Sequence, residues 1–226
     1  MEARNPNDTR HAAILGHSFV RRLASAVDFE TSHNGEPSHV RAAHALRVSQ
    51  NFDRVYIDGT DGAYIRDLIR LTNFMKDTKI DVVIFNSGSN DLCHWRADPV
   101  QLAKNLVSIG DYITTVFDVK LVCYCSAIYR DRCRQITPAE FKCRATKFNA
   151  ELMAQCAQRS GHRYFSFKGF WKDVEHDQPM PVSMWSTDGI HPGPAVNTPG
   201  FIKYRRNMRR CLLAASAELT AILTKI

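Results

Sequence analysis

Five short apolar runs alternate along the chain with longer stretches of helical periodicity, and this alternation constrains the fold most strongly. Strands that alternate with helices form right-handed β-α-β units, which build a mostly parallel sheet covered on both faces. We therefore predict an α/β protein, a three-layer α/β/α sandwich with about five mostly parallel strands. The runs are rich in β-branched and aromatic residues, and they lie at residues 11–15, 54–57, 81–85, 120–126 and 163–167.

Helices are predicted between these strands from apolar side chains that recur three and four residues apart. This spacing is clearest at residues 102–116 and 141–156. Thr137 and Pro138 supply an N-cap and a first-turn proline for the second of these helices. Further helices are expected at 64–76 and 201–223. Residues 30–49 are interpreted as an excursion before the second strand, in which only 40–48 has a helical pattern. No linker divides the sequence, so residues 1–226 are interpreted as a single domain.

Composition excludes several classes of protein. The chain has 226 residues, 44% hydrophobic and 23% charged, so it is neither disordered nor fibrous. No apolar run approaches the roughly 20 residues of a membrane span, and charges interrupt the first apolar stretch, so we expect no membrane contact and no signal peptide. A cytoplasmic location is expected, with a nuclear one left open.

The seven cysteines are an odd number spread through expected strands and helices, as for reduced thiols that fill a core. No Cys-x-x-Cys pair is present, so a zinc site is not expected, and nothing in the sequence calls for another metal or a cofactor.

Small polar residues and glycines follow the first three predicted strands. The sequence reads Gly-His-Ser-Phe at 16–19, Asp-Gly-Thr-Asp-Gly-Ala at 58–63 and Asn-Ser-Gly-Ser-Asn-Asp at 86–91. A fourth block, Trp-Ser-Thr-Asp-Gly-Ile-His-Pro, occupies 185–192, shortly before the last predicted helix. Each block alone is common in turns. Ligands of open parallel sheets bind beyond the carboxyl ends of the strands, so we expect the functional site where these blocks meet.

In this order the four blocks resemble those of the SGNH hydrolases, also called GDSL-type esterases. The resemblance extends from Ile14 to His191. It implies a flavodoxin-like α/β/α fold and, most often, hydrolysis of an ester. It also implies roles that acyl transfer requires, with Ser18 as nucleophile, His191 as base and Asp188 as the group that orients the base.

The same resemblance implies an oxyanion hole. Its donors are the Ser18 N–H, the Gly62 N–H and the Asn90 side chain. Gly62 is preferred to Gly59 because Gly-Ala before a helix start matches the second block better.

Structural alternatives exist for each of these residues. A serine at a strand–helix junction is often a helix N-cap, and Asn90 and Asp91 are common turn formers. Asp188 before glycine suits a turn, and His191 suits a loop. We assign Asp91 a structural role.

His17 is the main departure, because the family usually has Asp before the nucleophile at this place. We expect this His variant of the first block to point away from Ser18, since successive side chains alternate, and we do not assign His17 as the base. A neutral or cationic group would then replace an anion near the site.

Positive charge suggests a second function. The formal net charge is +7, and much of it lies in the last predicted helix. Five basic residues lie together on one side of that helix, where an ordinary solvated face is the simpler interpretation: Lys203, Arg205, Arg206, Arg209 and Arg210. Residues 129–132 either line the cleft or form a solvated turn.

Two hypotheses follow. The first is a serine ester hydrolase that cleaves a small acetyl or short acyl ester. The alternative is a catalytically weak or silent SGNH-like module that binds nucleic acid or another anionic partner through the basic helix. The oligomeric state is left open.

Overall fold

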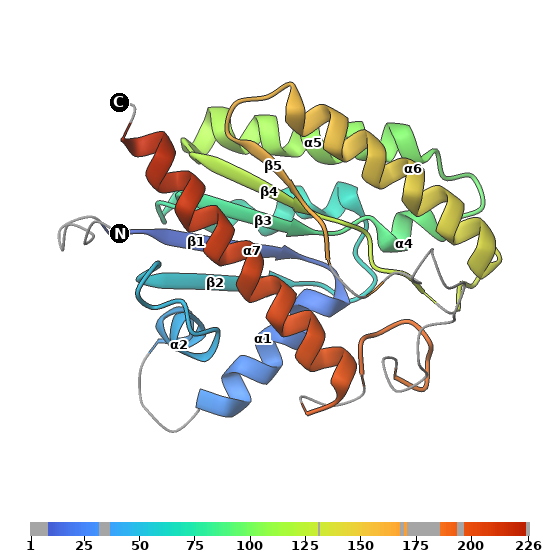
Figure 1. Cartoon of the computed structure of the whole chain (residues 1–226), viewed down its shortest axis with the longest axis horizontal. Coiled ribbons are helices and arrows are strands. Elements are labelled where there is room, and N and C mark those ends of the chain that lie inside the picture. Colours follow the sequence, from blue (N-terminus) through green and yellow to red (C-terminus); the bar gives the residue numbers. More distant parts are fainter. Residues whose placement is uncertain are drawn as a thin grey trace.

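Five parallel strands form one central sheet in the computed structural model of the chain (Figure 1). The structure describes residues 9–31, 37–130, 132–167, 170, 186–193 and 197–224. The strand order is β2-β1-β3-β4-β5, which is the flavodoxin-like order. The predicted strand positions and parallel sheet are therefore confirmed, and the strands are β1 (His11–Gly16), β2 (Arg54–Gly59), β3 (Val82–Asn86), β4 (Leu121–Cys125) and β5 (His162–Phe165).

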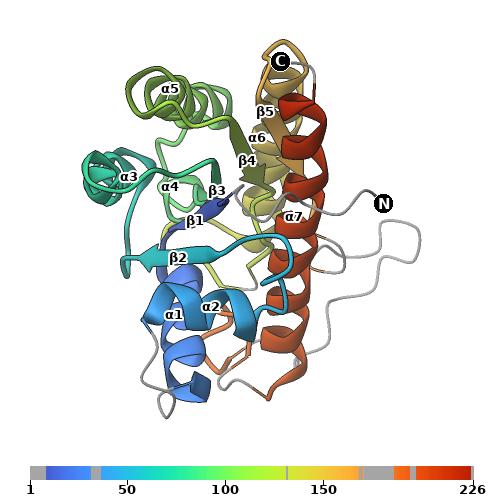
Figure 2. The same ribbon diagram turned by 90° about the vertical axis from the view of Figure 1, so that its left-hand side faces the viewer.

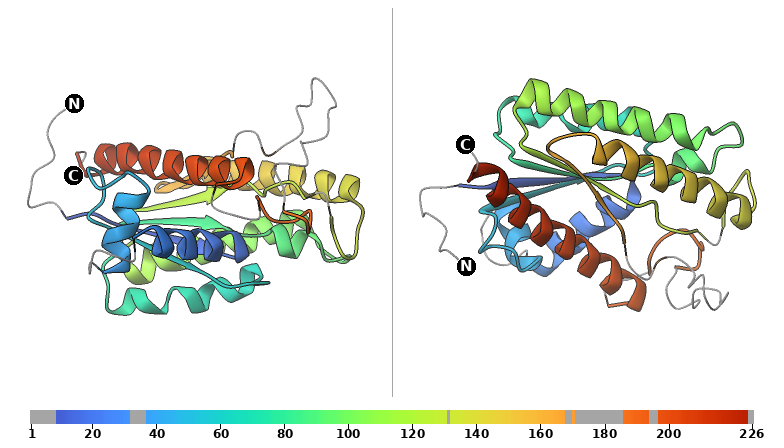
Figure 3. Two further views of the ribbon diagram at one scale, coloured as in Figure 1. Left: turned by 90° about the horizontal axis from the view of Figure 1, so that it is seen from below. Right: turned by 45° about the horizontal axis from the view of Figure 1, so that its top comes forward.

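Helices cover both faces of the sheet, which gives the predicted three layers (Figures 2 and 3). One face carries α1 (Ser18–Thr31), α2 (Ser38–Ala45) and α7 (Pro199–Leu223). The other face carries α5 (Pro99–Phe117), α6 (Pro138–Ala157) and a run of short turns that includes α3 (Leu68–Leu71).

Alternation along each buried strand explains why the sheet needs both layers. In β1, Ala12 and Ile14 join the core cluster under α1, α2 and α7, whereas Ala13 and Leu15 join the cluster under α5 and α6. The strands β1, β3 and β4 are apolar on both faces, as expected for strands inside a parallel sheet.

The register of the strands brings three of the sequence blocks to one edge of the sheet. Gly16, the last residue of β1, lies opposite Gly59 of β2 and Asn86 of β3. A Cβ atom on Gly16 would lie 2.3 Å from the Asn86 carbonyl oxygen, so this close approach requires glycine. The segments after these strands therefore begin side by side.

The predicted helix at 64–76 is wrong as a continuous element. The chain forms a 3₁₀ turn η1 (Ile65–Asp67), the single turn α3 and a second 3₁₀ turn η2 (Asn73–Lys76). The Thr72 hydroxyl donates to the Ile69 carbonyl oxygen, and a side chain that bonds locally in this way competes with regular helical bonds.

The other predicted helices are confirmed with small shifts of their ends. Within the excursion before β2, the stretch with a helical pattern at 40–48 forms α2, which ends before Arg47, whose φ of 56° cannot continue a helix. The last helix begins two residues earlier than predicted, with Pro199 in its first turn.

Candidate active site

Ser18 stands at the junction between β1 and α1, at the edge of the sheet where the sequence blocks meet. It is the first residue of α1, and the residue is only 6% exposed. Backbone N–H groups at the start of a helix have no partner within the helix. The Ser18 N–H and the Gly62 N–H indeed donate no hydrogen bond among the described residues.

His191 and Asp188 meet Ser18 from the loop that precedes α7. The His191 Nε2 atom lies 2.7 Å from the Ser18 Oγ atom, and the His191 Nδ1 atom lies 2.6 Å from the Asp188 Oδ2 atom. The other carboxylate oxygen of Asp188 accepts hydrogen bonds from the backbone N–H groups of Ile190 and His191 at 2.8 and 3.0 Å. The structure thus brings together the three side chains to which the sequence assigned these roles.

The Ser186 hydroxyl also donates to the Asp188 carboxylate, a contact that the sequence reasoning missed. Ser186 lies in the fourth block, and its position two residues before an aspartate is the only signal in the sequence for this contact.

Electrostatics favour an anionic Asp188 and a neutral His191. Burial raises the pKa of Asp188, but the hydrogen bonds from Ser186, His191 and Ile190 outweigh this effect and hold the pKa well below its usual range. Burial lowers the pKa of His191, and the nearby Arg22 adds to the lowering, whereas Asp188 opposes it. A neutral imidazole can accept a proton from a hydroxyl, so the pair is suited to general-base chemistry.

Asn90 enters the site from the turn after β3. Gly88 has a φ of 100°, and it leads directly into the single helical turn α4 (Ser89–Leu92). The Asn90 Nδ2 atom donates to the Ala63 carbonyl oxygen at 2.8 Å, and its Oδ1 atom accepts from Arg130 at 2.7 Å. One hydrogen of the amide group is therefore left for another acceptor, and the amide is held from two sides.

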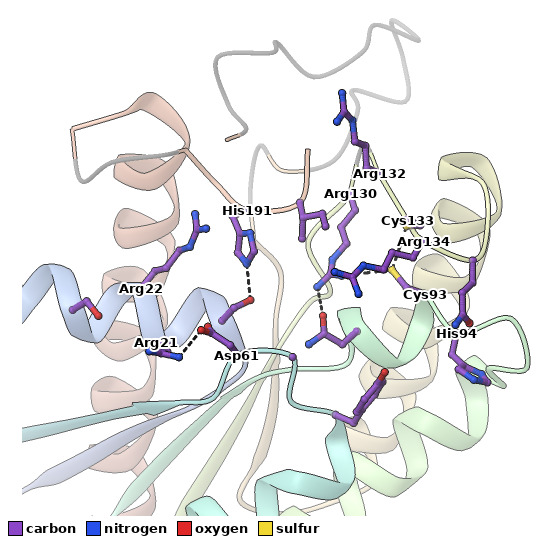
Figure 4. Close-up of a pocket in the computed structure, with 17 residues that line it drawn as sticks. Arg21, Arg22, Asp61, Cys93, His94, Arg130, Arg132, Cys133, Arg134 and His191 are labelled. Atoms are coloured by element: carbon purple, nitrogen blue, oxygen red, sulfur yellow. Dashed lines mark hydrogen bonds and ion pairs between the residues drawn. The ribbon is translucent and has the colours of Figure 1, made fainter. Parts of the chain in front are cut away.

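A pocket of about 520 Å³ opens beside these residues (Figure 4). Ser18, His191, Gly62 and Asn90 all line it, whereas Gly59 does not, which agrees with the preference for Gly62. Two thiols to which the sequence assigned no role also line the pocket. They belong to Cys93 and Cys133, and their sulfur atoms lie 3.2 Å apart.

The overall structure resembles solved enzymes of one kind. A GDSL-like lipase from Bacteroides thetaiotaomicron aligns with a TM-score of 0.61 at 10% identity, over 92% of this chain and 88% of that one. The chain has the fold of the GDSL-like lipases. A lipase/acylhydrolase from Enterococcus faecalis (TM-score 0.55, 17% identity) covers 89% of this chain and 94% of its own, and an acetyl xylan esterase (0.57, 13%) covers 91% and 98%. No protein-family model and no curated protein matches the sequence.

Within this GDSL-like fold, His17 is buried and does not bond to Ser18. Its Nδ1 atom accepts from the Phe19 N–H at 3.4 Å, and its Nε2 atom has no partner among the described residues. Burial, then Arg130 and His191, lower the pKa of His17 well below its usual value. A neutral ring therefore stands where the family usually has a carboxylate.

Asp91 has a structural environment. Both of its carboxylate oxygens accept from the Ile65 N–H, at 3.2 and 3.1 Å, and burial raises its pKa to about 6. This contact ties the third sequence block to the second. It agrees with a structural role for Asp91.

Two of the five basic residues predicted on the last helix, now α7, donate hydrogen bonds to backbone carbonyl groups near α2. Arg205 donates to the Ala45 carbonyl oxygen at 2.6 Å, and Arg209 donates to the Arg47 carbonyl oxygen at 3.4 Å. These carbonyls lie at the end of α2, where helical carbonyl groups need partners. Lys203, Arg206 and Arg210 complete the predicted basic face, and a nucleic-acid partner for it remains a prediction.

Two further observations concern the described part of the chain. None of its helices is long and apolar enough to cross a membrane. The described residues also contain no group of three His, Cys, Asp or Glu side chains that would hold a metal ion.

Proposed function

We propose that this chain is a serine ester hydrolase of the SGNH type, which cleaves a small acetyl or short acyl ester. The observation that carries the proposal is the chain of hydrogen bonds from Ser18 through His191 to Asp188, at 2.7 and 2.6 Å. A nucleophile, a base and a group that orients the base are the three parts that acyl transfer requires. A pocket of about 520 Å³ suits a small substrate, and one solved protein with this fold is an acetyl xylan esterase.

The reaction begins when the Ser18 Oγ atom attacks the ester carbonyl carbon and its proton passes to the His191 Nε2 atom. Asp188 keeps the other ring nitrogen of His191 protonated and stabilises the imidazolium that forms. The carbonyl oxygen becomes an oxyanion, which accepts hydrogen bonds from the Ser18 N–H, the Gly62 N–H and the Asn90 amide.

The tetrahedral intermediate then collapses. The bond to the alcohol oxygen breaks, and the alcohol leaves with the proton from His191, so an acyl ester remains on Ser18. A water molecule next gives its proton to His191 as it attacks the acyl carbon. The acid is released when the Ser18 oxygen takes that proton back.

Hydrolysis of p-nitrophenyl acetate tests this proposal. We expect turnover by the wild type and a loss of at least about a thousandfold in Ser18→Ala and in His191→Ala, because either change removes a group used in every step. Ser108→Ala is the matched control, since Ser108 is an exposed serine of α5 outside this pocket. Hydrolysis that survives Ser18→Ala unchanged would contradict the proposal.

A further inference from the structure

The described residues that line the pocket beside Ser18 carry an excess of positive charge. Among the described residues, one acidic side chain lines it, that of Asp61, and this carboxylate already pairs with Arg21. Arg22 lies 3.8 Å from Asp188, which is bound to His191. The remaining three arginines of the wall form no ion pair with a described carboxylate, and they are Arg130, Arg132 and Arg134.

Arg130 is a buried cation that forms no ion pair with a described carboxylate. The residue is only 4% exposed, and its Nε atom has no hydrogen-bond partner among the described residues. Its other nitrogens donate to Asn90 at 2.7 Å and to the Cys93 sulfur at 3.6 Å. Burial lowers the pKa of Arg130, but a guanidinium stays protonated in proteins. A buried charge of this kind is costly unless an opposite charge comes close to it.

Arg132 and Arg134 add exposed positive charge to the wall of the same pocket. The Arg132 N–H donates to the Gly189 carbonyl oxygen at 3.2 Å. Its side-chain carbons lie so close to Gly189 that a Cβ atom there would be 2.8 Å away. Arg132 is therefore held against the loop that carries His191. It is exposed, and its guanidinium points away from Arg130 and His191 (Figure 4).

We propose that the ester this pocket takes carries an anionic group, a carboxylate or a phosphate, on one of its two halves. Arg132 and Arg134 bind this group, and Arg130 supplies positive potential deeper in the pocket, beside Asn90. Guanidinium groups bind both kinds of anion well, because their planar donors match two oxygens at once. The inference rests on the proposed function, since it names the substrate class of the same site.

Matched pairs of esters test the two possible positions of the anion. For the alcohol half, 4-acetoxybenzoate is compared with the neutral 4-acetoxybenzamide. For the acid half, phenyl hydrogen succinate is compared with phenyl succinamate after the uncatalysed rates are subtracted. The measured quantity is the ratio of kcat/KM for the anionic ester to kcat/KM for its neutral partner.

The variant Arg132→Gln/Arg134→Gln removes two positive charges from the pocket. Arg70→Gln/Lys147→Gln removes two from exposed positions outside it and is the control. We expect the pocket variant to lower the ratio by roughly tenfold in one arm, because kcat/KM for the anionic ester falls more than kcat/KM for its neutral partner. The control keeps the wild-type ratio, and added salt reduces the difference.

The outcomes separate this inference from the proposed function. In one outcome, the wild type cleaves the neutral esters while the pocket variant keeps the wild-type ratio in both arms. This result overturns the proposal of an anionic substrate and leaves the proposed function standing. A wild type that cleaves no ester overturns the proposed function. The anion site is then judged by titrating Ser18→Ala with 4-acetoxybenzoate, which must bind more weakly once Arg132 and Arg134 are also changed to glutamine.

Discussion

Replacing Asn90 with alanine separates catalysis from structure within the candidate site. The proposed role of the Asn90 amide is to donate a hydrogen bond to the oxyanion. Loss of one such donor costs about 2.7–4 kcal/mol of transition-state stabilisation, which is a fall of roughly 10²–10³ in kcat. KM is expected to change little, because the oxyanion exists only after attack begins.

The same substitution also has a structural cost that the contacts define. It removes the acceptor of the Arg130 hydrogen bond at 2.7 Å and the donor to the Ala63 carbonyl oxygen at 2.8 Å. A buried group left without a partner costs about 1–3 kcal/mol of stability. Each kcal/mol lowers the Tm of a domain of this size by roughly 2–4 °C.

Asn149→Ala is the matched control. The Asn149 Oδ1 atom accepts from the buried Ala127 N–H at 2.9 Å, and Asn149 does not line the pocket. Its loss is expected to lower Tm by a similar amount, with p-nitrophenyl acetate hydrolysis preserved. Steady-state kinetics and thermal unfolding of both variants give the comparison. An Asn90→Ala enzyme with wild-type kcat would refute the oxyanion role.

Three further predictions concern protonation in the pocket. Asp188→Asn is expected to lower kcat roughly 10⁴-fold with little change in fold, because His191 loses the group that sets its tautomer. Steady-state kinetics and circular dichroism measure the two effects, and a variant with full activity contradicts the prediction. A protonated His191 accepts no proton, so kcat/KM for a neutral ester is expected to fall as the pH decreases through the pKa of His191. Burial lowers that pKa, so the midpoint of the fall lies below the ordinary 6.5. A midpoint at or above 6.5 contradicts this prediction. A hydrogen bond from Cys133 lowers the pKa of Cys93 to about 7, with help from Arg130 and against the effect of burial. The rate at which iodoacetamide labels Cys93 should therefore rise with pH and reach half its maximum near pH 7. A half-maximum near pH 9.0 contradicts this.

The sheet was predictable because its strands have simple physical signatures. The central strands are apolar on both faces, and this pattern is visible in the sequence without any long-range contact. Glycine and small polar residues after the strands then predicted where the site would form, since parallel strands end at one edge. The helix ends followed local signals such as Thr137, whose side chain accepts from the Glu140 N–H.

The interrupted helix after β2 shows the limit of local reasoning. Apolar spacing at 64–76 suits a helix, yet the Asp67 side chain accepts from the Tyr64 N–H and the Thr72 hydroxyl bonds to the Ile69 carbonyl oxygen. Side chains that satisfy the backbone in this way favour short turns over a continuous helix. Spacing of apolar residues does not reveal which alternative has the lower free energy.

Arg130 shows why the electrostatics of the site required a structure. Its surrounding sequence fits a solvated turn as well as a cleft wall, and its bond to Asn90 joins residues 40 positions apart. The same holds for Arg205, which bonds to Ala45 over a separation of 160 residues. Such contacts depend on how the layers pack, and no local pattern encodes them.

Covalent labelling with a fluorophosphonate tests the central claim most directly, because only a serine that is activated by its neighbours reacts readily with this probe. Intact mass and peptide mapping locate the adduct. The account predicts one adduct on Ser18 of the folded wild type, none on Ser18→Ala and strongly reduced labelling of His191→Ala. A folded wild type that stays unlabelled, or an adduct carried by another residue, would contradict it.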